Sequence, residues 1–211
     1  MGGRIVTTNH LILKILNLKI GLYFGSFNPV HHGHLVIASH VVNNTDLQQV
    51  WLVISPQNPL KKVGSLLNEY HRFYMVQLAV EGENKLKASN IEFQLPKPSY
   101  TVDTLAYLVE KYPQHEFSVI MGSDSFCNIK NWKNYETILK NHPLYIYERQ
   151  GFEITNMPGA TINILEAPLL EISSTHIRAM VRDGKSIRYL VPDSVKEEIE
   201  RNSYFKKVSV P

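Results

Sequence analysis

The stretch KIGLYFGSFNPVHHGH, residues 19–34, places an apolar run directly before a Gly-Ser-Phe turn and three histidines. The run KIGLYF predicts a strand, and the segment from His34 to about Asn43 predicts a helix. Gly25 and Ser26 let a ligand approach the backbone closely between these two elements. The first amides of a helix lack partners within it and carry the positive end of its dipole. The stretch therefore predicts a strand–turn–helix unit that can receive an anion at its turn.

The same alternation of strand-length and helix-length segments continues along the chain. Further strands are expected at residues 49–55, 88–93, 116–122, 143–149 and 160–167. Helices are expected at residues 68–82, 101–113, 174–182 and 193–202. Alternating strands and helices favour right-handed crossovers and a mainly parallel sheet. The predicted fold class is therefore α/β, a single Rossmann-like doubly wound domain with flanking helices.

One helix pattern predicts which side chains are buried. In the segment 68–82, helical spacing predicts a shared buried face for five apolar residues, namely Tyr70, Phe73, Met75, Leu78 and Ala79.

Composition and charge indicate a packed domain that handles small molecules. The chain has 211 residues and a formal net charge of +3, with its Lys and Arg residues scattered along its length. This balance fits small anions better than nucleic acid. Cys127 is the one cysteine, which excludes an internal disulfide and any multi-cysteine metal site and favours a cytoplasmic location. Residues 1–17 are interpreted as a flexible N-terminal extension before a domain at 18–211, and their broken apolar run predicts neither a targeting signal nor a membrane span.

Four polar loops are expected at one edge of the sheet. They are GSFNPVHHGH at 25–34, SPQNPLKK at 55–62, GSDSFCNIKNW at 122–132 and ISSTHIR at 172–178. Ligands of open α/β sheets bind at the carboxyl ends of the strands, near the point where strand order reverses. The loops therefore predict one shared binding site.

The histidines allow three interpretations. His31 and His34 are three residues apart, so that in a helical turn both can face one point while His32 points elsewhere. Phosphate contact is the favoured role, because the turn before them suits an anion. A zinc half-site would need further ligands from scattered Asp, Glu or His residues. Surface histidines without a role are the third interpretation.

Two signatures together carry a family resemblance. GSFNPVHHGH resembles the HxGH signature of the nucleotidyltransferase superfamily, and ISSTHIR resembles its second signature, ISSTxxR. With SYTVDTL at 99–105 and the spacing of GSDSFCNIKNW, the chain resembles bacterial nicotinate-mononucleotide adenylyltransferases from about Lys19 to Phe205. The resemblance implies transfer of AMP from ATP to nicotinate mononucleotide, which yields deamido-NAD and pyrophosphate for NAD biosynthesis. It further implies that the acceptor phosphate attacks directly, without a covalent intermediate.

The resemblance also implies roles for particular residues. The catalytic set is His31, His34 and Arg178. The ATP-binding set is Gly25, Ser26, Phe27, Lys62, Gly122, Asp124, Ser173, Ser174 and Thr175. The acceptor-binding set is Asn28, Thr101 and Trp132, with Trp132 stacked on the pyridine ring. No protein metal site is implied, and Mg²⁺ is expected to bind chiefly through the ATP phosphates.

The resemblance leaves some questions open. Asn28 stands where the family commonly has Asp, which puts details of acceptor or metal-water placement in doubt. Pantetheine-phosphate adenylyltransferase is a rival enzyme, and a nucleotide-sensing module without turnover is a rival of another class. ATP and nicotinate mononucleotide are the expected partners, without nucleic acid or membrane. The chain is expected to be a monomer or a homo-oligomer.

Overall fold

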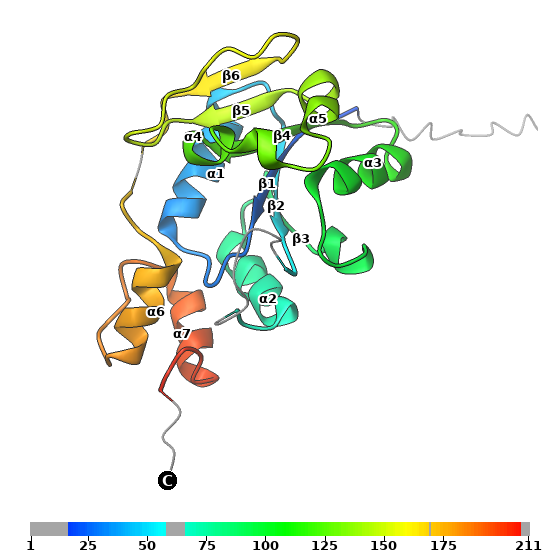
Figure 1. Cartoon of the computed structure of the whole chain (residues 1–211). Coiled ribbons are helices and arrows are strands. Elements are labelled where there is room, and N and C mark those ends of the chain that lie inside the picture. The colour runs from blue at the N-terminus through cyan, green and yellow to red at the C-terminus, as the bar shows by residue number, and fades with distance from the viewer. Residues whose placement is uncertain (1–16, 58–65, 169, 208–211) are drawn as a thin grey trace, which may run out of the picture.

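A computed structural model describes residues 17–57, 66–168 and 170–207 of the chain. Six strands form one sheet in the order β3-β2-β1-β4-β5-β6, and every neighbouring pair is parallel. The strands are β1 (Lys19–Gly25), β2 (Gln49–Ile54), β3 (Leu86–Ser89), β4 (Glu116–Gly122), β5 (Leu144–Tyr147) and β6 (Ile162–Leu165). This order confirms the doubly wound α/β fold, since β1 to β3 extend one way and β4 to β6 the other (Figure 1).

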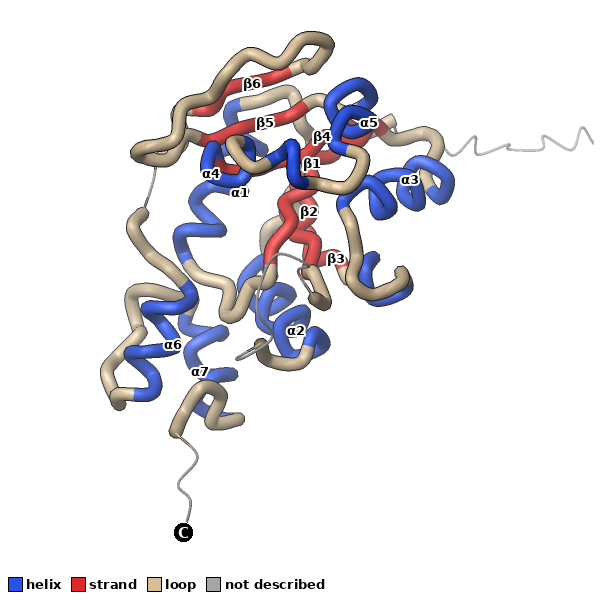
Figure 2. The backbone as a smooth tube through the Cα atoms, in the orientation of Figure 1, coloured by secondary structure: helices blue, strands red, loops and turns tan. Residues whose placement is uncertain are grey.

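Seven α-helices and two short 3₁₀-helices lie within the described residues, and most join successive strands (Figure 2). The α-helices are α1 (His32–Asn44), α2 (Glu69–Val80), α3 (Thr101–Lys111), α4 (Ser123–Phe126), α5 (Tyr135–Asn141), α6 (Ser174–Arg182) and α7 (Asp193–Arg201). The 3₁₀-helices are η1 (Ile91–Gln94) and η2 (Ile129–Asn131). The four helices expected after the first one are all present. The expected extension at 1–17 lies outside the described residues, apart from Asn17.

Each face of the sheet has its own apolar core. Side chains of β1, β2 and β4 alternate between the two, as Leu22, Trp51 and Val119 lie in one core, and Tyr23, Leu52 and Ile120 lie in the other. Helices α1, α2, α6 and α7 supply buried side chains to the second core, and α3 and α5 supply them to the first. Both faces of the sheet are therefore covered, as a parallel sheet requires.

Two local expectations were wrong. The expected strand at 88–93 ends at Ser89, and Ile91–Gln94 forms η1. In α2 the buried residues are Arg72, Met75, Val76 and Val80, while Tyr70, expected on the buried face, is 63% exposed. The buried face of α2 is therefore rotated from the predicted one, because Arg72 points inward and donates hydrogen bonds to the loops that follow β1 and β2. Apolar periodicity cannot predict that a charged side chain points inward.

The strand order reverses between β1 and β4. The chain leaves β1 toward β2 and β3, and later returns to place β4 on the opposite side of β1. A crevice opens at such a switch point, because the two connections depart in opposite directions. The loops after Gly25 and Gly122 meet at this crevice and are two of the four loops that the sequence predicted for the site.

Candidate active site

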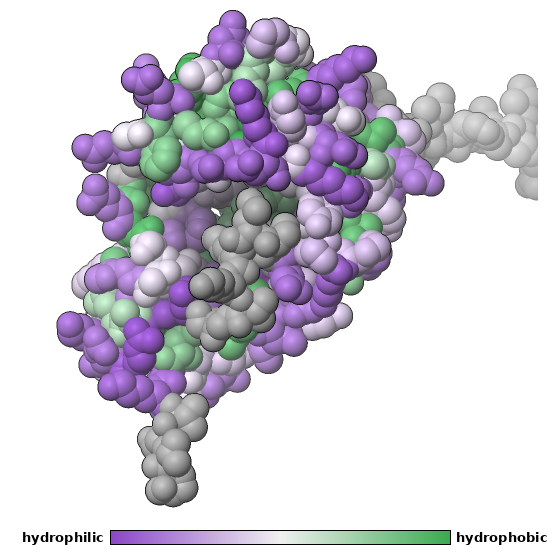
Figure 3. Space-filling model, viewed as in Figure 1, coloured by the Kyte–Doolittle hydropathy of each residue, from purple (hydrophilic) through white to green (hydrophobic). Residues whose placement is uncertain are grey.

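Two adjoining cavities occupy the carboxyl edge of the sheet. The larger has a volume of about 960 Å³, and the second has a volume of about 450 Å³. Both are lined by Gly25 and Ser26 of the first loop and by Asp124 of α4. The space-filling view shows the molecule hollowed between the part that holds β5 and β6 and the part that holds α6 and α7 (Figure 3). The arrangement can hold two ligands that meet where the cavities join.

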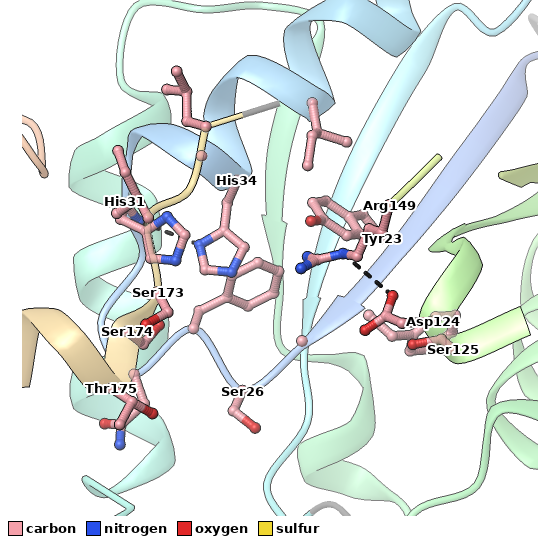
Figure 4. Close-up of a pocket in the computed structure, with 18 of the residues that line it drawn as sticks. Tyr23, Ser26, His31, His34, Asp124, Ser125, Arg149, Ser173, Ser174 and Thr175 are labelled. Atoms are coloured by element: carbon pink, nitrogen blue, oxygen red, sulfur yellow. Dashed lines mark hydrogen bonds and ion pairs between the residues drawn. The ribbon is translucent and has the colours of Figure 1, made fainter. Parts of the chain in front are cut away.

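The histidine pair lies in the larger cavity, at the start of α1. The rings of His31 and His34 stack with their centroids 3.7 Å apart, and the His31 backbone N–H donates to His34 Nδ1 at 3.3 Å (Figure 4). His32 is not among the residues that line either cavity. The expectation that His31 and His34 face one point is therefore confirmed.

Gly33 leaves room for this pair. A Cβ atom on Gly33 would lie 3.0 Å from His31 Nδ1 and 3.1 Å from His31 Cε1. His31 Nδ1 is buried and has no hydrogen-bond partner within the described part of the chain. The glycine of the signature therefore lets the His31 ring pack against the first turn of the helix.

The surroundings of His31 keep its imidazole neutral near pH 7. Burial lowers the pKa of His31 to about 4, with smaller contributions from Arg149 and His32. A neutral imidazole carries one N–H donor and no charge. His31 can therefore donate one hydrogen bond to a phosphate oxygen, and the positive charge around the site comes from arginines and the helix terminus.

The start of α6 holds the first loop from the opposite side. Ser174 Oγ donates to the Pro29 carbonyl at 2.8 Å, and Arg178 Nη1 donates to the Asn28 carbonyl at 2.8 Å. Ser173 caps the helix by accepting from the His176 backbone N–H at 3.2 Å. Ser174 and Arg178 thus hold the loop, while both residues also line the larger cavity.

Arg149 is a cavity residue that sequence reasoning missed. It lies just after β5 and points toward Asp124 and the histidine pair (Figure 4). Its Nε lies 3.2 Å from Asp124 Oδ1, and its Nη2 donates to the Tyr147 hydroxyl at 3.3 Å. Its place at the carboxyl end of a predicted strand is the signal that could have found it. Arg149 adds a guanidinium to the wall of the cavity beside the histidines.

The second cavity combines an aromatic surface with a helix start. Trp132 and Thr101 both line it, and Thr101 is the first residue of α3. Buried Glu92 accepts hydrogen bonds from Ser99 Oγ at 2.6 Å and from Thr104 Oγ1 at 2.9 Å. These bonds tie the segment before α3 to the helix itself. The cavity can therefore hold a flat ring beside polar groups.

The structure brings the predicted site residues together. All of them line one of the two cavities except Lys62, which lies outside the described residues. The described residues contain no group of three or more His, Cys, Asp or Glu side chains that could hold a metal ion. No helix in the described ranges is long and apolar enough to cross a membrane.

Comparisons with known proteins agree with this geometry. The Cytidylyltransferase-like family model matches residues 22–180. A Flavobacterium johnsoniae protein named "Probable nicotinate-nucleotide adenylyltransferase" is 50% identical over 193 residues, which cover 90% of this chain and 100% of that protein. A Cytophaga hutchinsonii protein of the same name is 51% identical over 189 residues, covering 89% of this chain and 98% of that protein.

A solved structure shares the fold. The Plasmodium falciparum nicotinic acid mononucleotide adenylyltransferase complexed with NaAD has a TM-score of 0.76 and 22% sequence identity, covering 90% of this chain and 98% of that chain. At this identity the likeness concerns the fold. The sequence relatives, which are similar over nearly their whole length, show that this chain belongs to the nicotinate-nucleotide adenylyltransferase family of cytidylyltransferase-like proteins.

Proposed function

We propose that the protein transfers AMP from ATP to nicotinate mononucleotide and releases deamido-NAD and pyrophosphate. The observation that carries this function is the pair of cavities that meet at Gly25, Ser26 and Asp124. The larger cavity carries the histidine pair and the start of α6, which suit a triphosphate. The second cavity carries Trp132 and the start of α3, which suit an aromatic acid. Solved relatives complexed with NaAD and with APC support the substrate classes.

The reaction proceeds by direct attack of the acceptor's 5′-phosphate on the α-phosphorus of ATP. The attacking oxygen is already ionised, so that no general base is needed. Such transfers depend on alignment of the attacking and leaving oxygens and on stabilisation of the spreading negative charge. The P–O bond to the acceptor forms as the bond to the β-phosphate oxygen breaks, and pyrophosphate carries away the electron pair. The protein's task is therefore placement and charge stabilisation.

The phosphate groups lie at the start of α1. His34 donates to the α-phosphate oxygens where charge develops, and neutral His31 donates to the neighbouring phosphate. The positive end of the α1 dipole and Arg149 add to this stabilisation. Arg178 lies on the opposite wall, where it can contact the β- and γ-phosphates while it holds the Asn28 carbonyl. These groups provide what a transferring nucleotidyl group requires.

The acceptor ring stacks on Trp132, and its carboxylate faces the first amides of α3 and the Thr101 hydroxyl. Free amides at a helix start favour an anion over a neutral amide. Lys133 also lines this cavity, with its Nζ 2.8 Å from Asp103 Oδ2. The pocket therefore favours nicotinate mononucleotide over nicotinamide mononucleotide.

Mg²⁺ is proposed as the cofactor, carried by the ATP phosphates and water. Asp124 is a carboxylate that lines both cavities, and it is already paired with Arg149. The protein side chains around the phosphates therefore fit an ion that is held chiefly by its substrate. When bound, the ion neutralises charge on the leaving pyrophosphate. We also propose a cytoplasmic location, which the single cysteine supports.

The test is pyrophosphate release with ATP and Mg²⁺ in the presence of nicotinate mononucleotide, nicotinamide mononucleotide or phosphopantetheine. We expect release to be at least about tenfold faster with the nicotinate acceptor than with the amide. Equal rates would remove the acid preference and leave the transfer reaction in place. Faster release with phosphopantetheine would instead support the rival enzyme. ATP binding without release from any acceptor would support a sensing module.

A variant pair tests the role of the histidines. His34→Ala should lower turnover by roughly 10²-fold or more, because it removes a donor to the developing charge. His32→Ala is the matched control, since His32 is two residues away and lines neither cavity. Equal losses in both variants would overturn the role of His34.

A further inference from the structure

Three side chains hold three carbonyls of the loop that connects β1 to α1. Arg72 Nη1 donates to the Ser26 carbonyl at 2.6 Å. Arg178 Nη1 donates to the Asn28 carbonyl, and Ser174 Oγ donates to the Pro29 carbonyl, both at 2.8 Å. The loop is thus held through its carbonyl oxygens, by Arg72 of α2 on one side and by Ser174 and Arg178 of α6 on the other.

Arg72 has the most extensive of these contacts. Its side chain is fully buried, and besides Ser26 it donates to the carbonyls of Ser55 at 2.9 Å, Pro56 at 3.0 Å and Leu67 at 2.7 Å. One guanidinium therefore joins the ends of β1 and β2 to the start of α2.

The charge of Arg72 is compensated chiefly by backbone carbonyls rather than by an ion pair within the described residues. Burial lowers the pKa of Arg72 to about 10, so that the guanidinium remains protonated near pH 7. Within the described ranges no carboxylate lies at ion-pair distance from it, and Glu69 of the same helix pairs with Lys97 at 2.6 Å. Burying such a charge is costly unless its donors are satisfied. Here backbone carbonyls satisfy them, and those carbonyls are drawn toward the interior.

Peptide geometry links these carbonyls to the cavity. In a planar trans peptide the N–H points opposite to the C=O. The Ser26–Phe27 and Pro56–Gln57 peptides are trans, so the Phe27 and Gln57 N–H groups point away from Arg72. Ser26, Phe27 and Gln57 all line the larger cavity.

We propose that Arg72 is a positioning residue for phosphate binding, which holds the Phe27 and Gln57 amides toward the larger cavity as donors to a phosphate. The proposal rests on the proposed function, because it needs a phosphate in that cavity. Arg72 itself does not reach the substrate, since its side chain is fully buried and its donors are engaged with carbonyls. Backbone N–H groups that face one concavity bind anions well.

The first experiment follows the backbone amides by ¹⁵N NMR while pyrophosphate is added to the full chain. In the wild-type protein the Phe27 and Gln57 amide protons should shift downfield together with those at the start of α6. If the α6 amides respond and those of Phe27 and Gln57 do not, the proposal is wrong while the proposed function stands. If no amide of the larger cavity responds and no transfer is measured, the proposed function fails as well.

The second experiment compares two variants. Arg72→Lys keeps the charge but replaces the planar fork with a compact ammonium that cannot reach all four carbonyls. It should lower kcat/KM for ATP by roughly tenfold or more and abolish the amide response, while the KM for nicotinate mononucleotide changes little. Ser194→Ala is the matched control, because Ser194 Oγ donates to the Leu78 carbonyl near the far end of α2 at 3.3 Å.

These variants separate positioning from stability. Ser194→Ala should lower the free energy of unfolding and leave the amide response and kcat/KM unchanged. If Arg72→Lys shows a wild-type amide response and wild-type kcat/KM, Arg72 does not position the loop. Should Arg72→Lys fail to fold, the titration of the wild-type protein decides the proposal alone.

Discussion

Substitution of Gly33 by Ala tests the geometry of the histidine pair directly. The new Cβ would lie 3.0 Å from His31 Nδ1, 3.1 Å from His31 Cε1 and 3.7 Å from the Ile172 carbonyl oxygen. Carbon atoms in contact normally lie about 3.5–4.0 Å apart. The His31 ring must therefore shift by a few tenths of an ångström. Because the ring stacks on His34 with the centroids 3.7 Å apart, the shift displaces the second ring as well.

Two opposing effects set the change in stability. Ala instead of Gly within a helix stabilises by about 1 kcal/mol. Crowding a packed position costs about 1–3 kcal/mol. We expect the free energy of unfolding of Gly33→Ala to fall by about 0–2 kcal/mol. Turnover should fall by roughly tenfold, because a displacement of this size misaligns the donors to the phosphates, and a misplacement of about 1 Å can cost about 10²-fold.

Urea denaturation and pyrophosphate release measure the two effects separately. Ser39→Ala is the control, since Ser39 lies on the exposed surface of the same helix and should change neither quantity substantially. Turnover within about threefold of the wild type would contradict this role of Gly33, because the donors would then tolerate a displaced ring. A stability loss above about 4 kcal/mol would also refute it, since the backbone rather than the ring would have moved.

Three further predictions concern pH and the acceptor. Because the pKa of His31 is lowered to about 4, the unfolded chain binds a proton between pH 6.5 and about 4 that the folded protein does not bind. Acidification across this window should therefore lower the free energy of unfolding by up to about 3 kcal/mol. In urea denaturation His31→Gln should lose that slope; an unchanged slope would contradict the assignment. Burial raises the pKa of Glu92, so stability falls as pH rises from 4.5 through the folded pKa, and Glu92→Gln should flatten that decline. A decline as steep as in the wild type would exclude Glu92 as its source. Trp132→Leu should raise the KM for nicotinate mononucleotide about tenfold and leave that for ATP unchanged, whereas equal changes in both would argue against stacking.

Local patterns predicted most of the fold, and long-range contacts account for the errors. The segment around Arg72 was correctly predicted as helical, because its length and spacing are local properties. Its buried face was wrongly predicted, because the groups that compensate the buried guanidinium are carbonyls of Ser26, Ser55 and Pro56. These lie 16–46 positions away in the chain. Similarly, Arg149 was not predicted as a site residue, because it becomes one only where the fold brings Asp124 and the histidines beside it.

Local sequence patterns were enough to predict the six strands and five of the seven α-helices along the chain, the sheet edge that holds the candidate site, and the pairing of His31 with His34, whereas α4 and α5 were not predicted. The predicted features follow from periodicity, from helical spacing and from the handedness of parallel crossovers. Long-range packing establishes that Arg178 and Ser174 hold loop carbonyls 150 and 145 positions away, and that burial lowers the pKa of His31. Hydrogen-bond partners and desolvation depend on which distant segments surround a side chain, and the local sequence pattern does not specify those neighbours.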